Sequence, residues 1–294
     1  MSFCERSVHL KCRAEILEAE MLDSNHIVIC GKDYETPNEI HCQVIADSKI
    51  GLGISVGTTS KANEDCLGVS MLEDDVLFAI ADGHWGREAS ELAIQRAMDL
   101  FRSADHLPKE NEIRARFYAL FEQINGELFE MAMANPGASA PETTLIVCHL
   151  KEIESEKYLY WSSFGDSFLF ILRGDELIQL NSLNAYWLGM LSRLSESSQT
   201  RQLVLKSLFG ESRYVGVADG LETGVEKLLP GDVIMLCTDG LIGSDEKVPE
   251  PVSHKIQKIL NEIVPLENKI KELVKSALDR GEQDNVACIV AQID

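Results

Sequence analysis

In the stretch FAIADGHWGRE, residues 78–88, an apolar run passes directly into an acid, a glycine and a histidine. Apolar runs that end at Asp-Gly are typical of strands followed by turns, so a plain turn is the simplest interpretation. The pattern recurs at Asp239 after DVIMLCT (232–238), and Asp284 directly precedes NVACIVAQI (285–293). These acids therefore mark the predicted ends of strands.

Strand ends in one sheet, or in two facing sheets, bring such acids together. Glu64 and Asp65 follow the predicted strand LGISVG (52–57) after a short loop. A further pair, Asp219-Gly220, also ends an apolar run, so the dipeptide alone does not define a site. Carboxylates that gather without Lys or Arg repel one another, and divalent cations are their natural counter-charge. All-oxygen ligands of this kind suit Mg²⁺ or Mn²⁺.

Composition excludes several classes of partner. The chain has 294 residues, of which 45% are hydrophobic, so it can build one large domain or two small ones. Its 27 basic and 48 acidic residues leave a net charge of −21, which disfavours nucleic acid and anionic membranes. No apolar segment reaches the roughly 18 residues of a membrane span, and the N-terminus is too charged for a signal peptide. We expect a cytoplasmic protein.

Cysteine usage agrees with that expectation. The chain has 8 cysteines and no CxxC pair, and several of them, such as Cys148 and Cys237, lie within apolar runs. We expect buried, reduced thiols rather than a disulfide or zinc framework.

Strand-like and helix-like stretches come in blocks rather than in strict alternation, which predicts an α+β fold. After the strands at 52–57 and 75–81, helices are predicted over 87–103 and 110–135. Short spacing predicts an antiparallel run of four further strands, with a hairpin turn at Arg173–Asp175. These strands are expected at 143–150, 157–164, 167–173 and 176–180. Further along the chain, a strand is expected at 232–238, helical stretches at 252–280 and a final strand at 285–293.

The first 50 residues follow no clear pattern. They are expected either to add strands at HIVIC (26–30) and HCQVIA (41–46) or to form a separate appendage. We therefore divide the chain into an N-terminal extension of uncertain structure, residues 1–50, and a main domain, residues 51–294.

Five segments in order, KANED (61–65), ADGHWG (81–86), FGDS (164–167), CTDGL (237–241) and GEQDNVACIV (281–290), carry a resemblance. Over roughly residues 50–294 the chain resembles the PP2C (PPM) family of metal-dependent protein serine/threonine phosphatases. The resemblance implies a PP2C-like sandwich of two antiparallel β-sheets flanked by α-helices. It also implies a site for two metal ions at one end of the sandwich.

The resemblance also implies roles for individual residues. His84 matches the proposed general acid, and Asp82 would bridge the two ions. The carbonyl of Gly83 would bind one ion, and Asp239 and Asp284 would bind the other. Asp65 and Glu64 would hold metal-bound waters. Asp166 would help to hold a third, weaker ion. Two ions acidify a shared water for attack on phosphorus. A proton donor such as His84 then assists the poor leaving alkoxide.

The chain departs from the family in several places. Many members have an arginine that grips phosphate where this chain has Ser60; the adjacent Lys61 offers only a point charge, and Arg87 is another source. Gly243 stands where an acid is common, which puts the third ion in doubt. Trp85 replaces a small residue, and it either walls the cleft or fills a surface gap.

The favoured function is therefore Mg²⁺- or Mn²⁺-dependent hydrolysis of phosphoserine or phosphothreonine in proteins. One alternative is a pseudophosphatase, a binding module that recognises a partner without turnover. Hydrolysis of a small phosphorylated molecule is another. The expected partner is a phosphorylated protein, with no nucleic acid and no membrane; the oligomeric state stays open.

Overall fold

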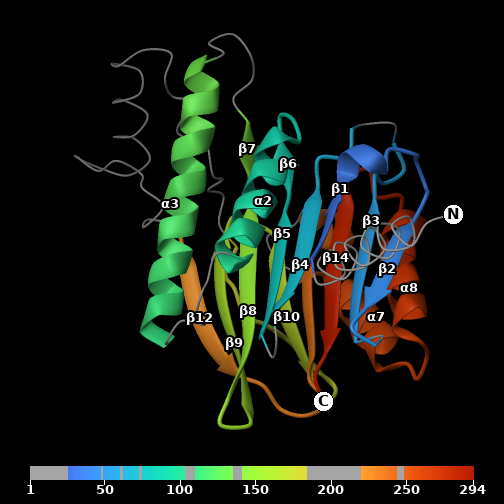
Figure 1. Cartoon of the computed structure of the whole chain (residues 1–294). Coiled ribbons are helices and arrows are strands. Elements are labelled where there is room, and N and C mark those ends of the chain that lie inside the picture. Colours follow the sequence, from blue (N-terminus) through green and yellow to red (C-terminus); the bar gives the residue numbers. More distant parts are fainter. Residues whose placement is uncertain are drawn as a thin grey trace, which may run out of the picture.

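Two six-stranded sheets pack face to face, with helices on both outer faces (Figure 1). The structure, a computed structural model, describes residues 26–47, 49–59, 62–72, 75–102, 110–134, 141–183, 220–243 and 248–294. Every strand pairing in it is antiparallel. The predicted α+β sandwich of two antiparallel sheets is confirmed.

The first sheet has the strand order β1-β4-β5-β8-β9-β12. Its strands are β1 (His26–Cys30), β4 (Cys66–Leu72), β5 (Asp75–Ala81), β8 (Leu145–Ile153), β9 (Glu156–Phe164) and β12 (Glu222–Lys227). The second sheet has the order β11-β10-β13-β14-β3-β2. Its strands are β2 (His41–Ile45), β3 (Ile50–Ser55), β10 (Phe168–Arg173), β11 (Glu176–Gln179), β13 (Val233–Cys237) and β14 (Val286–Gln292). A third sheet of two short strands joins β6 (Gly83–His84) to β7 (Glu142–Thr143).

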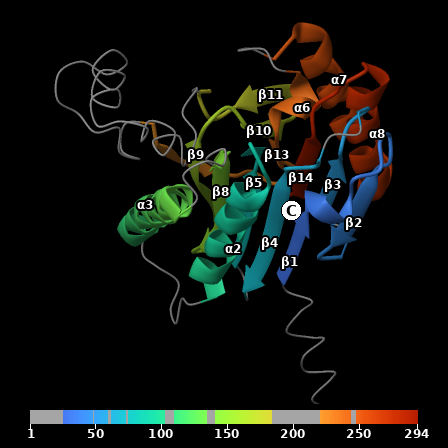
Figure 2. The ribbon, with the colours of Figure 1, turned by 90° about the horizontal axis from the view of Figure 1, so that it is seen from above.

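Helices cover each sheet on the side that faces away from the other sheet (Figure 2). The two helices predicted over 87–103 and 110–135 are present as α2 (Glu88–Arg102) and α3 (Glu110–Ala134), and they pack on the first sheet. The helices α6 (Asp239–Ile242), α7 (Glu250–Asn261) and α8 (Leu266–Asp279) pack on the second. A 3-10 helix, η1, spans Gly31–Asp33. In the described part of the chain, no helix is both long and apolar enough to span a membrane.

Side chains alternate between the two faces of each sheet along the strands, which produces three buried apolar layers. In β5, Phe78 and Ile80 face the second sheet, whereas Leu77, Ala79 and Ala81 face α2 and α3. Because successive side chains of a strand point to opposite faces, a strand that is buried on both faces is apolar throughout. The run that ends at Asp82 is therefore a central strand, and its polar end emerges at one end of the sandwich.

The run of four strands that begins at β8 is divided between the sheets, which the sequence does not indicate. β8 pairs with β9 in the first sheet, but β10 pairs with β11 in the second. The chain crosses between the layers at Gly165, whose φ of 109° is a left-handed conformation that favours glycine. The predicted antiparallel hairpin at Arg173 is confirmed, since Arg173 lies opposite Glu176.

Both strands considered within the N-terminal extension are present. β1 pairs with β4 at one edge of the first sheet, and β2 pairs with β3 at one edge of the second. Residues 26–47 are therefore built into the sandwich rather than set apart from it as an appendage. Residues 1–25 of the predicted extension lie outside the described residues.

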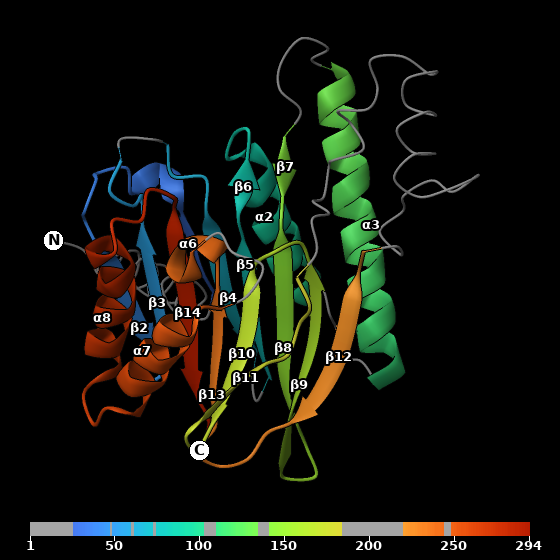
Figure 3. The ribbon, with the colours of Figure 1, turned by 180° about the vertical axis from the view of Figure 1, so that it is seen from behind.

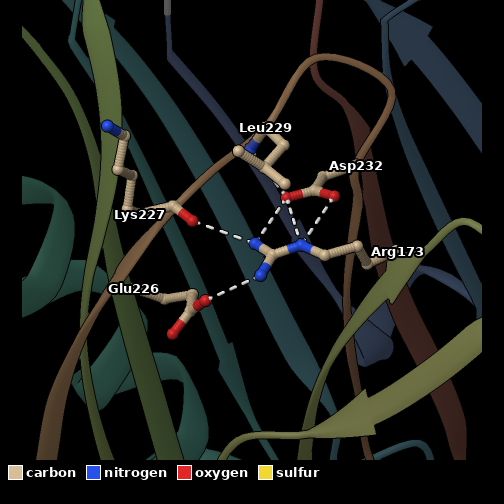
Figure 4. Close-up of polar contacts among 5 residues, drawn as sticks. All are labelled: Arg173, Glu226, Lys227, Leu229 and Asp232. Atoms are coloured by element: carbon tan, nitrogen blue, oxygen red, sulfur yellow. Dashed lines mark hydrogen bonds and ion pairs between the residues drawn. The ribbon is translucent and has the colours of Figure 1, made fainter.

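Figure 3 shows β10 of the second sheet and β12 of the first from behind. Arg173, at the end of β10, ties the two sheets together (Figure 4). Arg173 Nη2 lies 2.8 Å from Oδ2 of Asp232, a carboxylate that is only 2% exposed. The same guanidinium donates to Glu226 and to the carbonyl of Lys227, on β12 of the first sheet. A bidentate pair of this kind compensates the burial of Asp232.

Candidate active site

A cavity of about 380 Å³ opens at the end of the sandwich where the predicted acids lie. Its charged or titratable lining side chains are Glu64, Asp82, His84, Asp166, Asp239 and Asp284. They come from both sheets, because β5 of the first sheet leads into Asp82 and β13 of the second leads through Thr238 into Asp239. No lysine or arginine is among the described residues of the lining.

Two glycines let the acid-bearing segments approach each other. A Cβ atom added at Gly83 would lie 2.6 Å from the carbonyl oxygen of Glu64. One added at Gly240 would lie 1.9 Å from the carbonyl oxygen of Asn285. Contacts this short are possible only without a side chain, so the glycine that follows each aspartate has a packing role as well as a turn role.

The backbone of Asp82 is held by two threonines. Thr144 accepts a hydrogen bond from the Asp82 amide at its hydroxyl, at 3.0 Å, and donates its own amide to the Asp82 carbonyl, at 2.9 Å. The Thr143 hydroxyl donates to the same carbonyl at 2.7 Å. Thr144 is itself in hydrogen-bond contact with Ser167, next to Asp166. The position of Asp82 is therefore fixed relative to the crossing that carries Asp166.

Asp65 lies beneath the cavity rather than in its lining. It is 1% exposed, and its Oδ2 accepts a hydrogen bond of 2.9 Å from the Thr238 hydroxyl. Asn285 supports the neighbouring segment. Its side-chain Oδ1 accepts a hydrogen bond from the backbone amide of Glu64 at 2.8 Å, and its backbone amide donates to Asp284 Oδ1 at 2.9 Å. Thr238 and Asn285 thus tie the three acid-bearing segments together.

Burial and mutual repulsion raise the pKa values of these carboxyl groups. Burial, followed by the charges of Asp65, Asp239, Asp284 and Asp166, raises the pKa of Asp82 well above its ordinary value. Burial and the charges of Asp284 and Asp166 raise the pKa of Asp239 to about 7, although a hydrogen bond with the Asp82 carboxyl acts in the opposite direction.

Burial is also the main cause of the raised pKa values of Asp65 and Glu64. Burial raises the pKa of Asp65 well above its ordinary value, against the Thr238 hydrogen bond that lowers it. Burial also raises the pKa of Glu64. Of these two groups, the charge of Arg87 opposes burial only at Glu64.

The donor set fits a hard divalent cation. Asp65 Oδ1 and Asp239 Oδ1 are buried and have no hydrogen-bond partner, which is costly for a carboxylate. All the side-chain donors are oxygens, as Mg²⁺ and Mn²⁺ prefer. In the described ranges, however, no three acidic, histidine or cysteine side chains already surround one point as a closed metal site. The structure thus brings the predicted ligands to one cavity without closing them around an ion.

His84 and Trp85 stand at the rim of this cavity. His84 lines it and lies opposite Glu142 in the short β6–β7 ladder, which orients it. The ring of Trp85 meets that of His84 edge to face, with centroids 4.8 Å apart. Trp85 is 53% exposed and has a φ of 65°, an uncommon conformation for a large side chain. It therefore stands beside the cavity and does not fill a gap in the packing.

Of the residues considered for gripping phosphate, Ser60 and Lys61 lie outside the described residues. Arg87 Nη1 forms an ion pair of 2.9 Å with Glu35, and Arg87 is absent from the lining. Gly243 ends α6, where it has a φ of 104° and its backbone amide donates a hydrogen bond to the Asp239 carbonyl. This left-handed conformation explains why a glycine stands at this position.

Three supporting residues, Thr144, Thr238 and Asn285, were not identified from the sequence. Thr238 and Asn285 each adjoin an aspartate within a motif, in CTDGL and EQDNV, and small hydroxyl or amide side chains beside such acids are the available signal. Thr144 lies outside the motifs, so no such signal marks it. Their partners lie 62, 173 and 221 residues away along the chain, so pairing could not be inferred from local pattern.

Comparison with known proteins identifies solved structures with the same fold. No protein-family model and no curated protein matches the chain. Among solved structures, a serine/threonine phosphatase of S. agalactiae is 19% identical, with a TM-score of 0.63, over 87% of this chain and 100% of that chain. The phosphatase Stp1 from Staphylococcus aureus is also 19% identical, with a TM-score of 0.63, over 90% of this chain and 100% of its own.

A third structure is described with metal. The catalytic domain of the phosphatase PstP, in complex with 2 manganese ions, is 22% identical, with a TM-score of 0.58, over 87% of this chain and 100% of that chain. The chain therefore has the fold of the bacterial PP2C-type serine/threonine phosphatases, as its motifs predict.

Proposed function

We propose that this protein is a Mg²⁺- or Mn²⁺-dependent phosphatase that hydrolyses phosphoserine or phosphothreonine in proteins. One observation carries the proposal: the acids of both sheets converge on a single cavity, and no basic residue is present in its described lining. A phosphate group is excluded from so negative a cavity unless cations bind first. The acids therefore make sense as ligands for cations that in turn attract phosphate.

Each residue then has a task that its contacts support. Asp82, Asp239, Asp284 and the carbonyl of Gly83 would hold two ions, and Asp65, Glu64 and Asp166 would complete their surroundings. Bound Mg²⁺ or Mn²⁺ would supply an acidified water and positive charge against the phosphoryl oxygens. Thr143 and Thr144 hold the Asp82 backbone in place, at 2.7 and 2.9 Å from its carbonyl.

His84 supplies the proton for the leaving group. It lines the cavity at the rim, where a serine or threonine oxygen of a protein substrate enters. An imidazole has an unperturbed pKa near neutrality, so it can donate a proton at physiological pH. The exposed ring of Trp85 meets the His84 ring edge to face, with ring centroids 4.8 Å apart.

The test is hydrolysis of p-nitrophenyl phosphate and of a phosphothreonine peptide, each with Mn²⁺, Mg²⁺ or EDTA. We expect turnover that requires metal, that EDTA abolishes and that Asp239→Asn reduces by roughly 100-fold or more. Asp47→Asn is the matched control, because Asp47 is an exposed turn residue with a φ of 51° that asparagine tolerates. Binding of Mn²⁺ measured by calorimetry should weaken in Asp239→Asn alone.

A pseudophosphatase is the second candidate, because Gly243 stands where the family often has an acid and Arg87 is paired with Glu35 and absent from the cavity lining. It predicts Mn²⁺ binding without turnover of either substrate, in protein whose folding is verified by circular dichroism. Turnover of p-nitrophenyl phosphate without turnover of any phosphopeptide would favour a small-molecule substrate instead.

A further inference from the structure

Two cysteines face each other across the β1–β4 edge of the first sheet. Cys30 ends β1 and Cys66 begins β4, and the two are direct partners in the antiparallel register. Their sulfur atoms are 2.7 Å apart, although the residues are 36 positions apart in the chain. Directly opposed residues of an antiparallel pair have Cα atoms about 4.5–5.5 Å apart, which lies within the range that a disulfide spans.

A second opposed pair shows that register alone does not make a reactive site. Cys237 and Cys288 are also partners, on β13 and β14, but both are fully buried, with 0% exposure. Burial raises the pKa of Cys288 to about 12. An oxidant in solvent cannot reach these thiols, and they stay uncharged. Cys30 differs because it is only partly buried.

The surroundings of Cys30 favour reaction at its sulfur. A hydrogen bond with the Cys66 thiol lowers the pKa of Cys30, and Lys32 acts in the same direction, against burial and the charge of Glu91. Lys32 pairs with Glu91 at 3.1 Å, which reduces that opposing charge. Cys66 is fully buried, with 0% exposure, whereas Cys30 is only partly buried. Cys30 is therefore the attacking thiol, and Cys66 is the resolving one.

The pair lies against the segment that carries two of the site acids. The Gly31 amide donates to the carbonyl of Asp65 at 2.8 Å, directly beside Cys30 and Cys66. Asn63 donates its side-chain amide to the Tyr34 carbonyl at 3.1 Å. A Cβ at Gly31 would lie 2.4 Å from the Asn63 carbonyl oxygen, so the two segments are in close backbone contact.

We propose that Cys30 and Cys66 are a redox-active dithiol, which a peroxide closes to a disulfide that locks β1 to the segment bearing Glu64 and Asp65. The Cys30 sulfur attacks the peroxide, breaks its O–O bond and becomes a sulfenic acid while water leaves. The Cys66 sulfur then displaces the hydroxyl group as a second water, so two thiols and one hydrogen peroxide give one disulfide and two waters. The proposal requires no phosphatase activity.

The test treats the reduced full-length chain with hydrogen peroxide, blocks free thiols and maps the peptides without reduction. We expect a peptide that links Cys30 to Cys66. We also expect a rise in Tm of roughly 5 °C that dithiothreitol reverses, because a bond between residues far apart in the chain restricts the unfolded state. Amide exchange of residues 63–66 should slow by about tenfold in the oxidised protein.

Three variants complete the design. Cys30→Ser and Cys66→Ser should each lose the link and the Tm rise, and Cys30→Ser removes the more exposed partner if the buried one impairs folding. Cys42→Ser, at another partly buried cysteine, should keep both. Links made only through Cys4 or Cys12, sulfinic acid at Cys30 without a link, or unchanged exchange at residues 63–66 would overturn the proposal.

Discussion

Asp82 and Asp239 line one cavity, although Asp82 follows a strand of the first sheet and Asp239 follows a strand of the second. Burial raises the pKa of both carboxyl groups, and the charge of Asp239 raises that of Asp82 further. The junction of the sheets therefore concentrates negative charge. Four predictions concern what neutralises it, what supports it and what it does.

Thermal stability of the metal-free protein should fall as the pH rises from about 5 to about 7. The pKa of Asp239 is about 7 in the folded protein, above its ordinary value of 3.8, so the folded state keeps a proton that the unfolded state has lost. For each such proton, the free energy of unfolding falls by about 1.4 kcal/mol per pH unit. Above the folded pKa, both states are ionised and this contribution levels off.

Melting curves in EDTA across that pH range measure the effect. Asp239→Asn should melt at a higher temperature than the wild type near neutral pH and should show a shallower pH dependence, whereas Asp47→Asn should follow the wild type. Saturating Mn²⁺ should stabilise the wild type most at the higher pH values, where protons compete least for the carboxylates. An unchanged pH slope in Asp239→Asn would contradict this account.

Thr238→Val should destabilise the protein and weaken metal binding. The Thr238 hydroxyl donates to Asp65 at 2.9 Å and accepts the Ala287 amide at 3.0 Å, and valine leaves both buried groups without this partner. We expect a loss of about 1–3 kcal/mol in the free energy of unfolding, measured by urea titration. Thr238→Ser keeps the hydroxyl, so it should recover most of the loss; equal losses in both variants would point to the missing methyl group instead.

Gly240→Ala should disrupt the site, whereas Gly126→Ala should not. An added Cβ at Gly240 would lie 1.9 Å from the Asn285 carbonyl oxygen, a backbone atom that cannot yield without moving Asp284. Gly126 lies within α3, and a Cβ there meets nothing within 4 Å. We expect a loss of several kcal/mol for Gly240→Ala and a gain of about 1 kcal/mol for Gly126→Ala. Chemical denaturation and Mn²⁺ calorimetry measure both.

His84→Gln should slow hydrolysis of a phosphothreonine peptide by roughly 100-fold but affect p-nitrophenyl phosphate far less. The threonine alkoxide needs a proton to leave, whereas p-nitrophenolate leaves readily without one. His254→Gln, at an exposed histidine on α7, is the matched control. Initial rates with Mn²⁺ test the prediction, and equal losses with both substrates would assign His84 to positioning rather than proton transfer.

Most of the helices and strands could be predicted because their signals are local. β5 coincides with the predicted run 75–81, and α2 and α3 match the predicted helices to within about one residue at each end. The division of β8–β11 between two sheets could not be predicted, because a hairpin and a crossing between layers look alike in sequence. The glycine conformation at Gly165 and the pairing of β10 with β13 decide between them.

The positions of Asp82, Asp239 and Asp284 at the ends of buried strands follow from the sequence alone, because each stands at the boundary of an apolar run. That these strand ends share one cavity follows only from the three-dimensional fold. The same holds for the burial of Asp65 under Thr238 and for the position of Cys30 opposite Cys66. Such relationships depend on strand order and register across large separations in the chain, where local propensity carries no information.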